Sequence, residues 1–338
     1  MTLELALAGT VLACLVIYAL LGGADFGGGV WDLLATGPRA AEQRETISGA
    51  IGPIWEANHV WMIVAVVLLF TAFPPAFAAI MTALHIPITL MLVGIVLRGS
   101  SFVFRKMDPR GEGVRSTWQR VFAVSSIVTP VMLGVVLGTI STPAIGYEDG
   151  VVTGGFVDPW LAPFPWMVGI FALALFAFLA AVYLTMETRN PELQDDFRIR
   201  ALWSALPVAL AGLAVLLMAP AAAPEVAKHL GGSAVGIALV VAGGVSLAGA
   251  VAALAARRYV SARVLAGGVV VLVLLGWGFG MDPWLLAGAL TIRESAAPPV
   301  TLRLVLGILG AGTVVLVPAF GYLYLTFKRQ VLFPDVDG

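Results

Sequence analysis

Charged residues are scarce in this sequence, and their scarcity excludes a soluble globular chain. Asp, Glu, Lys and Arg make up 12% of the 338 residues, whereas soluble domains carry roughly a quarter of charged residues. Hydrophobic residues make up 60% of the chain, and the mean hydropathy is +0.98. The composition therefore predicts a polytopic membrane protein, and the net charge of −1 says nothing about its partners.

Cysteine and histidine are also rare, which limits the cofactors that the chain can hold. The single cysteine, Cys14, excludes an internal disulfide and an iron–sulfur centre, which needs several cysteine ligands. Only His59 and His85 fall in apolar runs, and they are expected nearer opposite faces of the membrane, a poor arrangement for the axial ligands of one haem. We therefore expect no cofactor and no metal in this chain.

Motifs of soluble enzymes are missing as well. The sequence has no phosphate-binding loop, dinucleotide fingerprint or hydrolase triad, and its basic residues form no nucleic-acid patch. The N-terminus has no basic stretch and no small-residue cleavage site, so the first apolar run is expected to be a retained helix. Because no loop is long enough for a catalytic domain, the function is expected within or beside the bilayer.

What the sequence does contain is a series of apolar runs long enough to cross about 30 Å of hydrocarbon, which takes about 20 residues. The first and third runs exceed a simple span and are expected to be tilted, kinked or to project from the bilayer. In the first run, the glycines from Gly22 to Gly29 predict a kink or close helix packing. The nine predicted spans are Leu3–Ala35, Gly49–Thr71, Pro75–Phe104, Thr117–Ile140, Pro163–Glu187, Ile199–Ala219, Ala234–Ala256, Ser261–Met281 and Leu302–Phe327.

The distribution of basic residues predicts an orientation for these spans. Of the 19 Lys and Arg residues, 15 fall in the segments on one side of the membrane and 3 on the other, while Arg98 lies within a span. The positive-inside rule then places the N-terminus outside and the C-terminus in the cytoplasm. We predict an all-α, polytopic integral membrane protein of about nine transmembrane helices, arranged as two four-helix bundles plus one peripheral helix. Residues 1–338 form a single integral membrane domain.

Ionisable side chains inside the first three spans are the strongest functional signal, because bare charges are costly in hydrocarbon. At 1.5 Å per residue, Asp25 lies about 15 Å from the inner boundary, and Glu56 and Arg98 about 10 Å from it. Three groups of opposite sign are thus expected at a similar depth, where pairing would lower the desolvation cost of each.

The second span carries further polar residues around its acid. Glu56 and His59 are three residues apart and are expected to share a helix face, while Trp55, Asn58 and Met62 form an adjacent stripe. A carboxylic acid in a low dielectric exchanges protons closer to neutral pH. This pattern predicts a proton-handling site reached from the cytoplasm, with Asn58 and His59 holding water beside Glu56.

Simpler interpretations of the same residues remain open. Arg98 could extend its charged end toward the inner interface. Asp25 could be a structural partner for a neighbouring helix or for Arg98, and Glu56 could form a purely structural salt bridge. His85 is more typical of a hydrogen bond between helices than of a ligand. Asp32, close to the inner end of the first span, is expected to be solvated.

Four sequence blocks stand out in the first third of the chain, from residue 3 to residue 105. The blocks are GGADFGGGVWDL (Gly22–Leu33), IGPIWEANHVW (Ile51–Trp61), FPPAF (Phe73–Phe77) and LRGSSFVFR (Leu97–Arg105). In order and spacing they resemble the signature blocks of subunit II of cytochrome bd-type quinol oxidases, including the cyanide-insensitive branch. The helices at 117–327 match that family only in number and length.

This resemblance implies a role in a respiratory terminal oxidase in a prokaryotic cytoplasmic membrane. A haem-free subunit II would pair in a heterodimer with subunit I, which carries haem b and haem d and oxidises quinol while O₂ is reduced to water. Small accessory subunits and bound lipid or quinone are further possible partners. Trp55, Glu56 and Asn58 match the family block whose acid is implicated in proton uptake, and Asp25 and Arg98 match polar positions of other blocks.

The resemblance also defines the roles that we expect. Glu56 is the predicted principal proton relay, assisted by Asn58 and His59, and Asp25 and Arg98 would tune the local charge. Trp55 would have a structural role or lie at the subunit interface.

One position departs from the family, and two rival functions remain. Val103 stands where the family often has an acid between two phenylalanines, so a second proton route through that position is in doubt. A proton- or cation-coupled transporter would also place carboxylates and glycine-rich helices in the membrane. A purely scaffolding subunit would use the polar cluster only to fix helix packing.

Overall fold

The structure is a computed structural model that describes residues 2–52, 55–107 and 112–332, without the side chains of residues 105–116, 324 and 327–332. Pro53 and Ile54, in the second of the four sequence blocks, therefore lie outside the described residues. So does Arg110, one of the basic residues counted above. Within those limits, nine helices are long and apolar enough to cross a membrane. They are α1 (Leu3–Leu33), α3 (Trp55–Ala72), α5 (His85–Met107), α6 (Glu112–Ile140), α8 (Pro163–Leu184), α9 (Pro191–Ala222), α11 (Ala234–Ala255), α12 (Tyr259–Met281) and α13 (Pro299–Leu332).

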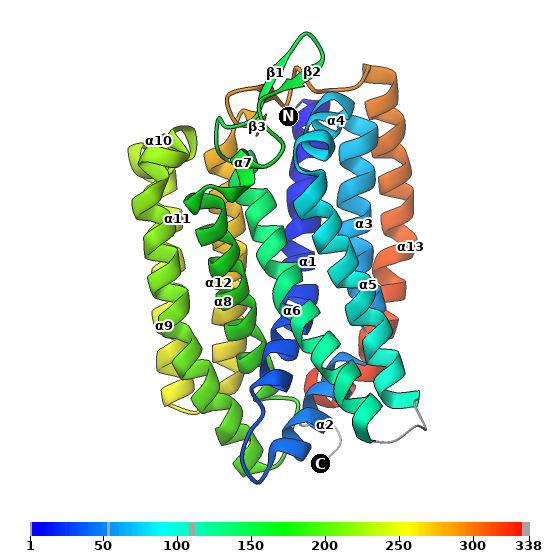
Figure 1. The fold of residues 1–338 in the computed structure, drawn as a ribbon, viewed down its shortest axis with the longest axis vertical. Helices are drawn as coiled ribbons and strands as arrows, with labels where there is room; N and C mark the ends of the chain where they lie inside the picture. Colours follow the sequence, from blue (N-terminus) through cyan, green and yellow to red (C-terminus); the bar gives the residue numbers. More distant parts are fainter. Residues whose placement is uncertain (1, 53–54, 108–111, 333–338) are drawn as a thin grey trace.

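Figure 1 shows these helices side by side as one elongated bundle, with α1 at its centre. Helix α1 contacts α3 and α6 on one side and α8 and α12 on the other, while the most extensive pairs are α5 with α6, α8 with α9, and α11 with α12. Helix α13 contacts only α1 and α3 to any extent among the described helices. The predicted all-α fold of nine spans is confirmed, with α13 peripheral among the described helices. Extensive contacts of α8 with α1 and α6 join the two predicted four-helix groups.

Short elements cover the two ends of the bundle. The amphipathic helix α2 (Ala40–Ile51) lies at the end where α1 finishes, and α4 (Pro74–Ala83), α7 (Asp158–Leu161) and α10 (Pro224–Gly232) lie at the other. Two hairpins, β1 (Gly146–Glu148) with β2 (Val151–Thr153) and β3 (Trp284–Leu286) with β4 (Leu290–Thr291), are antiparallel. Thr291 ends β4, and its hydroxyl and amide donate to Glu294 just beyond the strand. These bonds hold the pKa of the Glu294 carboxyl below its ordinary value.

Two of the predicted spans are interrupted. The predicted span Gly49–Thr71 is wrong at its start, because α2 ends at Ile51 and α3 begins at Trp55. The predicted span Pro75–Phe104 is divided at Leu84, whose φ of −112° and ψ of 23° lie outside the helical region. Pro87 explains the second break, since proline has no amide proton to donate to the carbonyl four residues earlier.

An ion-pair and hydrogen-bond network joins α2 to the first turns of α9. Arg39 donates to both carboxylate oxygens of Asp196, at 2.9 and 2.6 Å, and to Glu192 at 2.9 Å. Gln43 donates to Asp196 at 2.7 Å and accepts from Arg200 at 2.6 Å. The hydrogen bond to Asp196 raises the pKa of the Arg39 guanidinium above its ordinary value. This network fixes the position of α2 beneath the bundle.

The glycines of α1 allow close helix packing, as the sequence predicted, and the helix runs unbroken through them. A Cβ added at Gly23 would lie 2.6 Å from the ring of Phe176, and one added at Gly27 would overlap the carbonyl oxygen of that residue. Small residues at such positions let two backbones approach within a membrane. They bring α1 directly against α8, one turn from Asp25.

Trp31 adds a polar contact to the same interface. Its indole Nε1 donates to the carbonyl oxygen of Ala177 at 2.7 Å, and the side chain is buried. We expect Trp31→Phe to lower the free energy of unfolding by about 1 kcal/mol, the net value of one such hydrogen bond. Unfolding of the purified protein by SDS in mixed micelles measures this. The matched control is Trp203→Phe, because Trp203 is 72% exposed, and equal stability of the two variants would contradict the prediction.

Candidate functional site

The centre of the candidate site is Asp25, on the face of α1 that meets α3. Its side chain is 5% exposed, and its Oδ2 accepts a hydrogen bond of 2.7 Å from Nδ2 of Asn58. Asn58 is fully buried one turn into α3. Because α3 begins only at Trp55, its first turn is the part that reaches Asp25. The structure therefore brings together two of the predicted site residues.

Arg98 completes this buried cluster from α5. It is 2% exposed, and its Nη2 donates to the backbone carbonyl oxygen of Asp25 at 2.9 Å. Its guanidinium carbon lies 4.8 Å from the ring centroid of Phe26 and 5.3 Å from that of Phe122. Cation–π contacts of this kind are strongest where water is excluded. Arg98 is thus held inside the protein and does not extend to the interface.

Aromatic rings enclose His59 beside the cluster. Its ring centroid lies 5.7 Å from that of Tyr18, 5.9 Å from Phe26 and 6.2 Å from Trp55. Its Nδ1 is buried and has no hydrogen-bond partner among the described residues. The ring of Trp55 in turn packs against Gly99, where an added Cβ would lie 2.9 Å away. These contacts fix the start of α3 against α1 and α5.

Glu56 points away from this cluster. Its side chain is exposed on the surface of the chain, and no ion pair or hydrogen bond joins it to another described residue. The expectation that Glu56 pairs with Asp25 or Arg98 is therefore not met among the described residues, while water held beside it by Asn58 and His59 stays a prediction. The predicted depth of Glu56 agrees with the structure better than its predicted pairing does. Glu56 is only about 3 Å along the helix axis from Asn58, which donates a hydrogen bond to Asp25.

The two histidines of the first three spans do not form a haem site. His59 is in the first turns of α3, beside the Asp25 cluster, whereas His85 begins α5 at the opposite end of the bundle. His85 is exposed, with Nδ1 2.9 Å from the carbonyl oxygen of Thr82 and its ring against Phe156. The pair does not fit the two axial positions of one haem.

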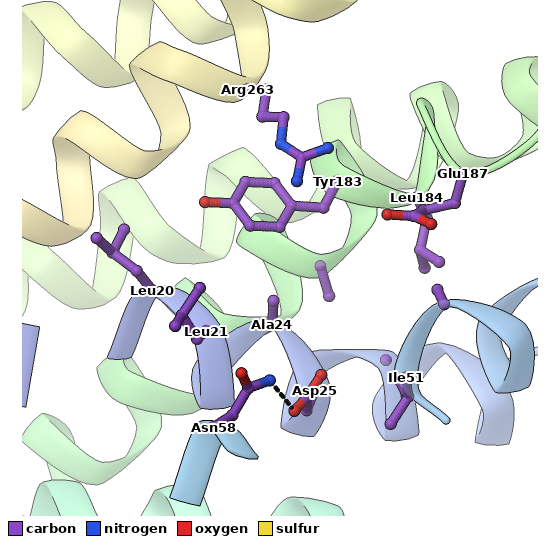
Figure 2. Close-up of a pocket in the computed structure, with 13 residues that line it drawn as sticks. Leu20, Leu21, Ala24, Asp25, Ile51, Asn58, Tyr183, Leu184, Glu187 and Arg263 are labelled. Atoms are coloured by element: carbon purple, nitrogen blue, oxygen red, sulfur yellow. Dashed lines mark hydrogen bonds between the residues drawn. The ribbon is translucent and has the colours of Figure 1, made fainter. Parts of the chain in front are cut away.

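Two features of the site were not found from the sequence. Asp32 is fully buried, so the expectation that it is solvated is wrong. A cavity of about 70 Å³ also reaches Asp25 and Asn58, and its far side is formed by Tyr183, Glu187 and Arg263 (Figure 2). A basic residue about one turn into the apolar α12 was the available signal for Arg263.

The arrangement is suited to holding and passing a proton. A cavity of this size has room for several water molecules, and it borders the buried carboxylate of Asp25, which Asn58 and Arg98 fix. A second carboxylate, that of Glu56, lies at similar depth on the outer surface of α3. A bare carboxylate facing hydrocarbon is costly, so this surface needs a polar neighbour or water.

Comparison with known proteins identifies the family. The family model described as cytochrome bd terminal oxidase subunit II matches residues 3–327. The cytochrome bd ubiquinol oxidase subunit 2 of Bacillus subtilis is 32% identical over 130 residues, which are 38% of each chain. The cytochrome bd-I ubiquinol oxidase subunit 2 of Escherichia coli K12 is 27% identical over 209 residues, which are 60% of this chain and 54% of the relative.

A solved structure shares the fold along the whole chain. The match to a chain of the bd oxidase from Geobacillus thermodenitrificans has a TM-score of 0.80 and 22% sequence identity, and it covers 97% of this chain and 99% of that one. The two curated relatives are matched over little more than half their own length at most.

Proposed function

This chain belongs to the cytochrome bd terminal oxidase subunit II family, and we propose that it acts as the haem-free subunit II of a quinol:oxygen oxidoreductase. It pairs with a subunit I that carries haem b and haem d and oxidises quinol. The chain itself contributes to proton uptake for the reduction of O₂ to water. Since reduction of O₂ consumes protons inside a water-poor membrane protein, titratable groups must deliver them.

This proposal rests on one observation, the similar depth of four residues along the bundle: Asp25, Asn58, Arg98 and Glu56. Asp25 is the inner proton-carrying group, and Asn58 and Arg98 hold it in place. Glu56, exposed at the same depth, faces subunit I and passes protons across the interface. Trp55 positions the start of α3, and His59, three residues after Glu56 on the same helix, assists the relay. Val103, 40% exposed on α5, supplies no acid for a second route.

The proposed orientation places α2 and the end of α13 in the cytoplasm and the N-terminus outside. The excess of Lys and Arg at that end of the bundle supports it. The membrane-embedded cavity of about 900 Å³ between α6, α8, α9, α11 and α12 fits a lipid or quinone as a further bound partner. A small accessory subunit is compatible with the exposed helices.

We expect Glu56→Gln and Asp25→Asn each to slow turnover of the purified oxidase at least severalfold, because each removes a titratable group and keeps its shape. The reduced-minus-oxidised haem spectrum should stay unchanged. Glu148→Gln, in the hairpin at the other end of the bundle, is the matched control.

Unchanged O₂ consumption in both variants would contradict proton delivery by this chain. It would instead support the alternative of a purely scaffolding subunit. A colourless preparation without a second subunit, which instead moves a solute, would indicate a transporter.

A further inference from the structure

The cavity beside Asp25 extends toward the end of the bundle where α2 lies, and the proposed function does not explain this extension. It lies between α1, α3, α8 and α12, and Ala50 and Ile51 at the end of α2 line it. Figure 2 shows Asp25 and Asn58 on one wall, with Tyr183 and Arg263 on the opposite wall and Glu187 at the side where α2 lies. Glu187 lies three residues beyond Leu184, the last residue of α8, and is half-buried. The cavity thus connects a carboxylate at the end of the bundle with one inside it.

Arg263 indicates that this cavity holds water. Its guanidinium carbon lies 4.5 Å from the ring centroid of Tyr183, which fixes the side chain on the wall. Its Nη1 is buried and has no hydrogen-bond partner among the described residues. A buried charged donor left without a partner is strongly destabilising. Water in the cavity satisfies it, and about 70 Å³ is enough for several molecules.

The charges on the walls favour the passage of a proton. Among the residues that line the cavity, the carboxylates of Asp25 and Glu187 flank a single guanidinium, that of Arg263. Arg98 is not part of this lining, and it donates to the backbone carbonyl oxygen of Asp25. With both acids ionised, the residues lining the cavity carry a net negative charge, which attracts a proton from water.

We propose that this cavity is a hydrated proton-uptake vestibule, in which Glu187 takes protons from the aqueous phase beside α2 and passes them to Asp25 through water held by Arg263. The inference rests on the proposed function, because it supplies the protons that Asp25 and Glu56 deliver. Each transfer breaks one O–H bond and forms another, and no electron moves.

The test uses the complete oxidase, and it measures the rate of proton uptake with a pH indicator during a single turnover with O₂. We expect Glu187→Gln to slow uptake about tenfold, less than the roughly hundredfold effect of a group that transfers a proton in a transition state, because bulk water also reaches the cavity. Glu187→Asp should restore most of the rate. The matched control, Glu45→Gln, changes an exposed acid of α2 that does not line the cavity.

The outcomes separate this inference from the proposed function. If Asp25→Asn slows uptake and Glu187→Gln behaves like Glu45→Gln, the vestibule is wrong and proton delivery by this chain stands. If Glu187→Gln slows uptake and Asp25→Asn does not, Glu187 does not supply Asp25, which also overturns the vestibule. If neither variant changes uptake, the vestibule fails together with the role of Asp25, and proton delivery by this chain then depends on the result for Glu56→Gln.

Hydration of the cavity can be tested without activity. Ala24 lines the cavity next to Asp25, so Ala24→Cys should react rapidly with Ag⁺ added on the side of α2. The wild-type chain is the control, because its single cysteine, Cys14, is 3% exposed on the same helix and does not line this cavity. Reaction no faster than in wild type would show a dry cavity and overturn the vestibule.

Discussion

Replacing Arg98 with leucine is expected to prevent accumulation of a stably folded chain in the membrane. The substitution removes the cation and leaves the Asp25 carboxylate buried, with its side-chain bond to Asn58 but without the guanidinium beside it. Removing one member of a buried charged pair costs about 3–5 kcal/mol, a large part of the stability of an ordinary domain. The aromatic rings of Phe26 and Phe122 lose their cation as well.

The measurement is the amount of the chain in purified membranes, followed by resistance of the detergent-extracted protein to heating. Arg258→Leu is the control, because Arg258 is exposed between α11 and α12. Arg98→Lys should be intermediate, since it keeps a charge and loses the planar group that spans the two rings and the Asp25 carbonyl.

A double variant separates charge from packing. If the unpaired carboxylate is the cause, Arg98→Leu combined with Asp25→Asn should accumulate better than Arg98→Leu alone. A double variant that is no better would show that the volume and cation–π contacts of Arg98 matter more than its charge.

The sequence predicted the parts of this structure that the membrane itself determines. Length and hydropathy were enough for nine spans, because a polar backbone can cross hydrocarbon only as a complete helix. Depth followed from the rise per residue, and the structure places Asp25, Asn58 and Arg98 together as that depth required.

Rotation of a helix about its own axis could not be predicted in the same way. The lipid-facing and protein-facing sides of α3 are both apolar, so the pattern does not tell which side is buried. Asn58 is fully buried while Glu56, two residues earlier, is exposed. Packing of α3 against α1 and α5 determines which side of α3 is buried, through contacts such as that of the Trp55 ring with Gly99.

The far wall of the cavity was missed for a related reason. Tyr183, Glu187 and Arg263 come from segments distant from Asp25 in the sequence, and the spacing of residues within one helix carries no information about them. The burial of Asp32 also depends on tertiary contacts, since distance from the end of a helix measures depth and not enclosure.

The second large effect is expected at Gly27, where the backbones of α1 and α8 meet. A methyl group at this position would overlap the carbonyl oxygen of Phe176 and lie 2.7 Å from Cβ of Ala180. A flexible side chain can move aside, but a helix carbonyl cannot do so without shifting its helix. Overpacking of a rigid interface costs about 1–3 kcal/mol, and more where the backbone must move.

Separation of α1 from α8 would also disturb the hydrogen bonds of the candidate site. Asp25 is two residues before Gly27, so a shift of this turn would disturb both the bond from Asn58 to its carboxylate and the bond from Arg98 to its carbonyl. We therefore expect Gly27→Leu to abolish the assembled oxidase and Gly27→Ala to reduce both its amount and its turnover.

The control for Gly27 is on the same helix. A Cβ added at Gly9 would meet nothing within 4 Å, so Gly9→Ala should be neutral or slightly stabilising, because alanine favours the helix by up to about 1 kcal/mol over glycine. Quantification of the assembled complex by its haem absorbance measures all three variants. If Gly27→Ala assembled as well as Gly9→Ala, α1 and α8 could separate at no cost, and the contact between their backbones would not be what positions Asp25.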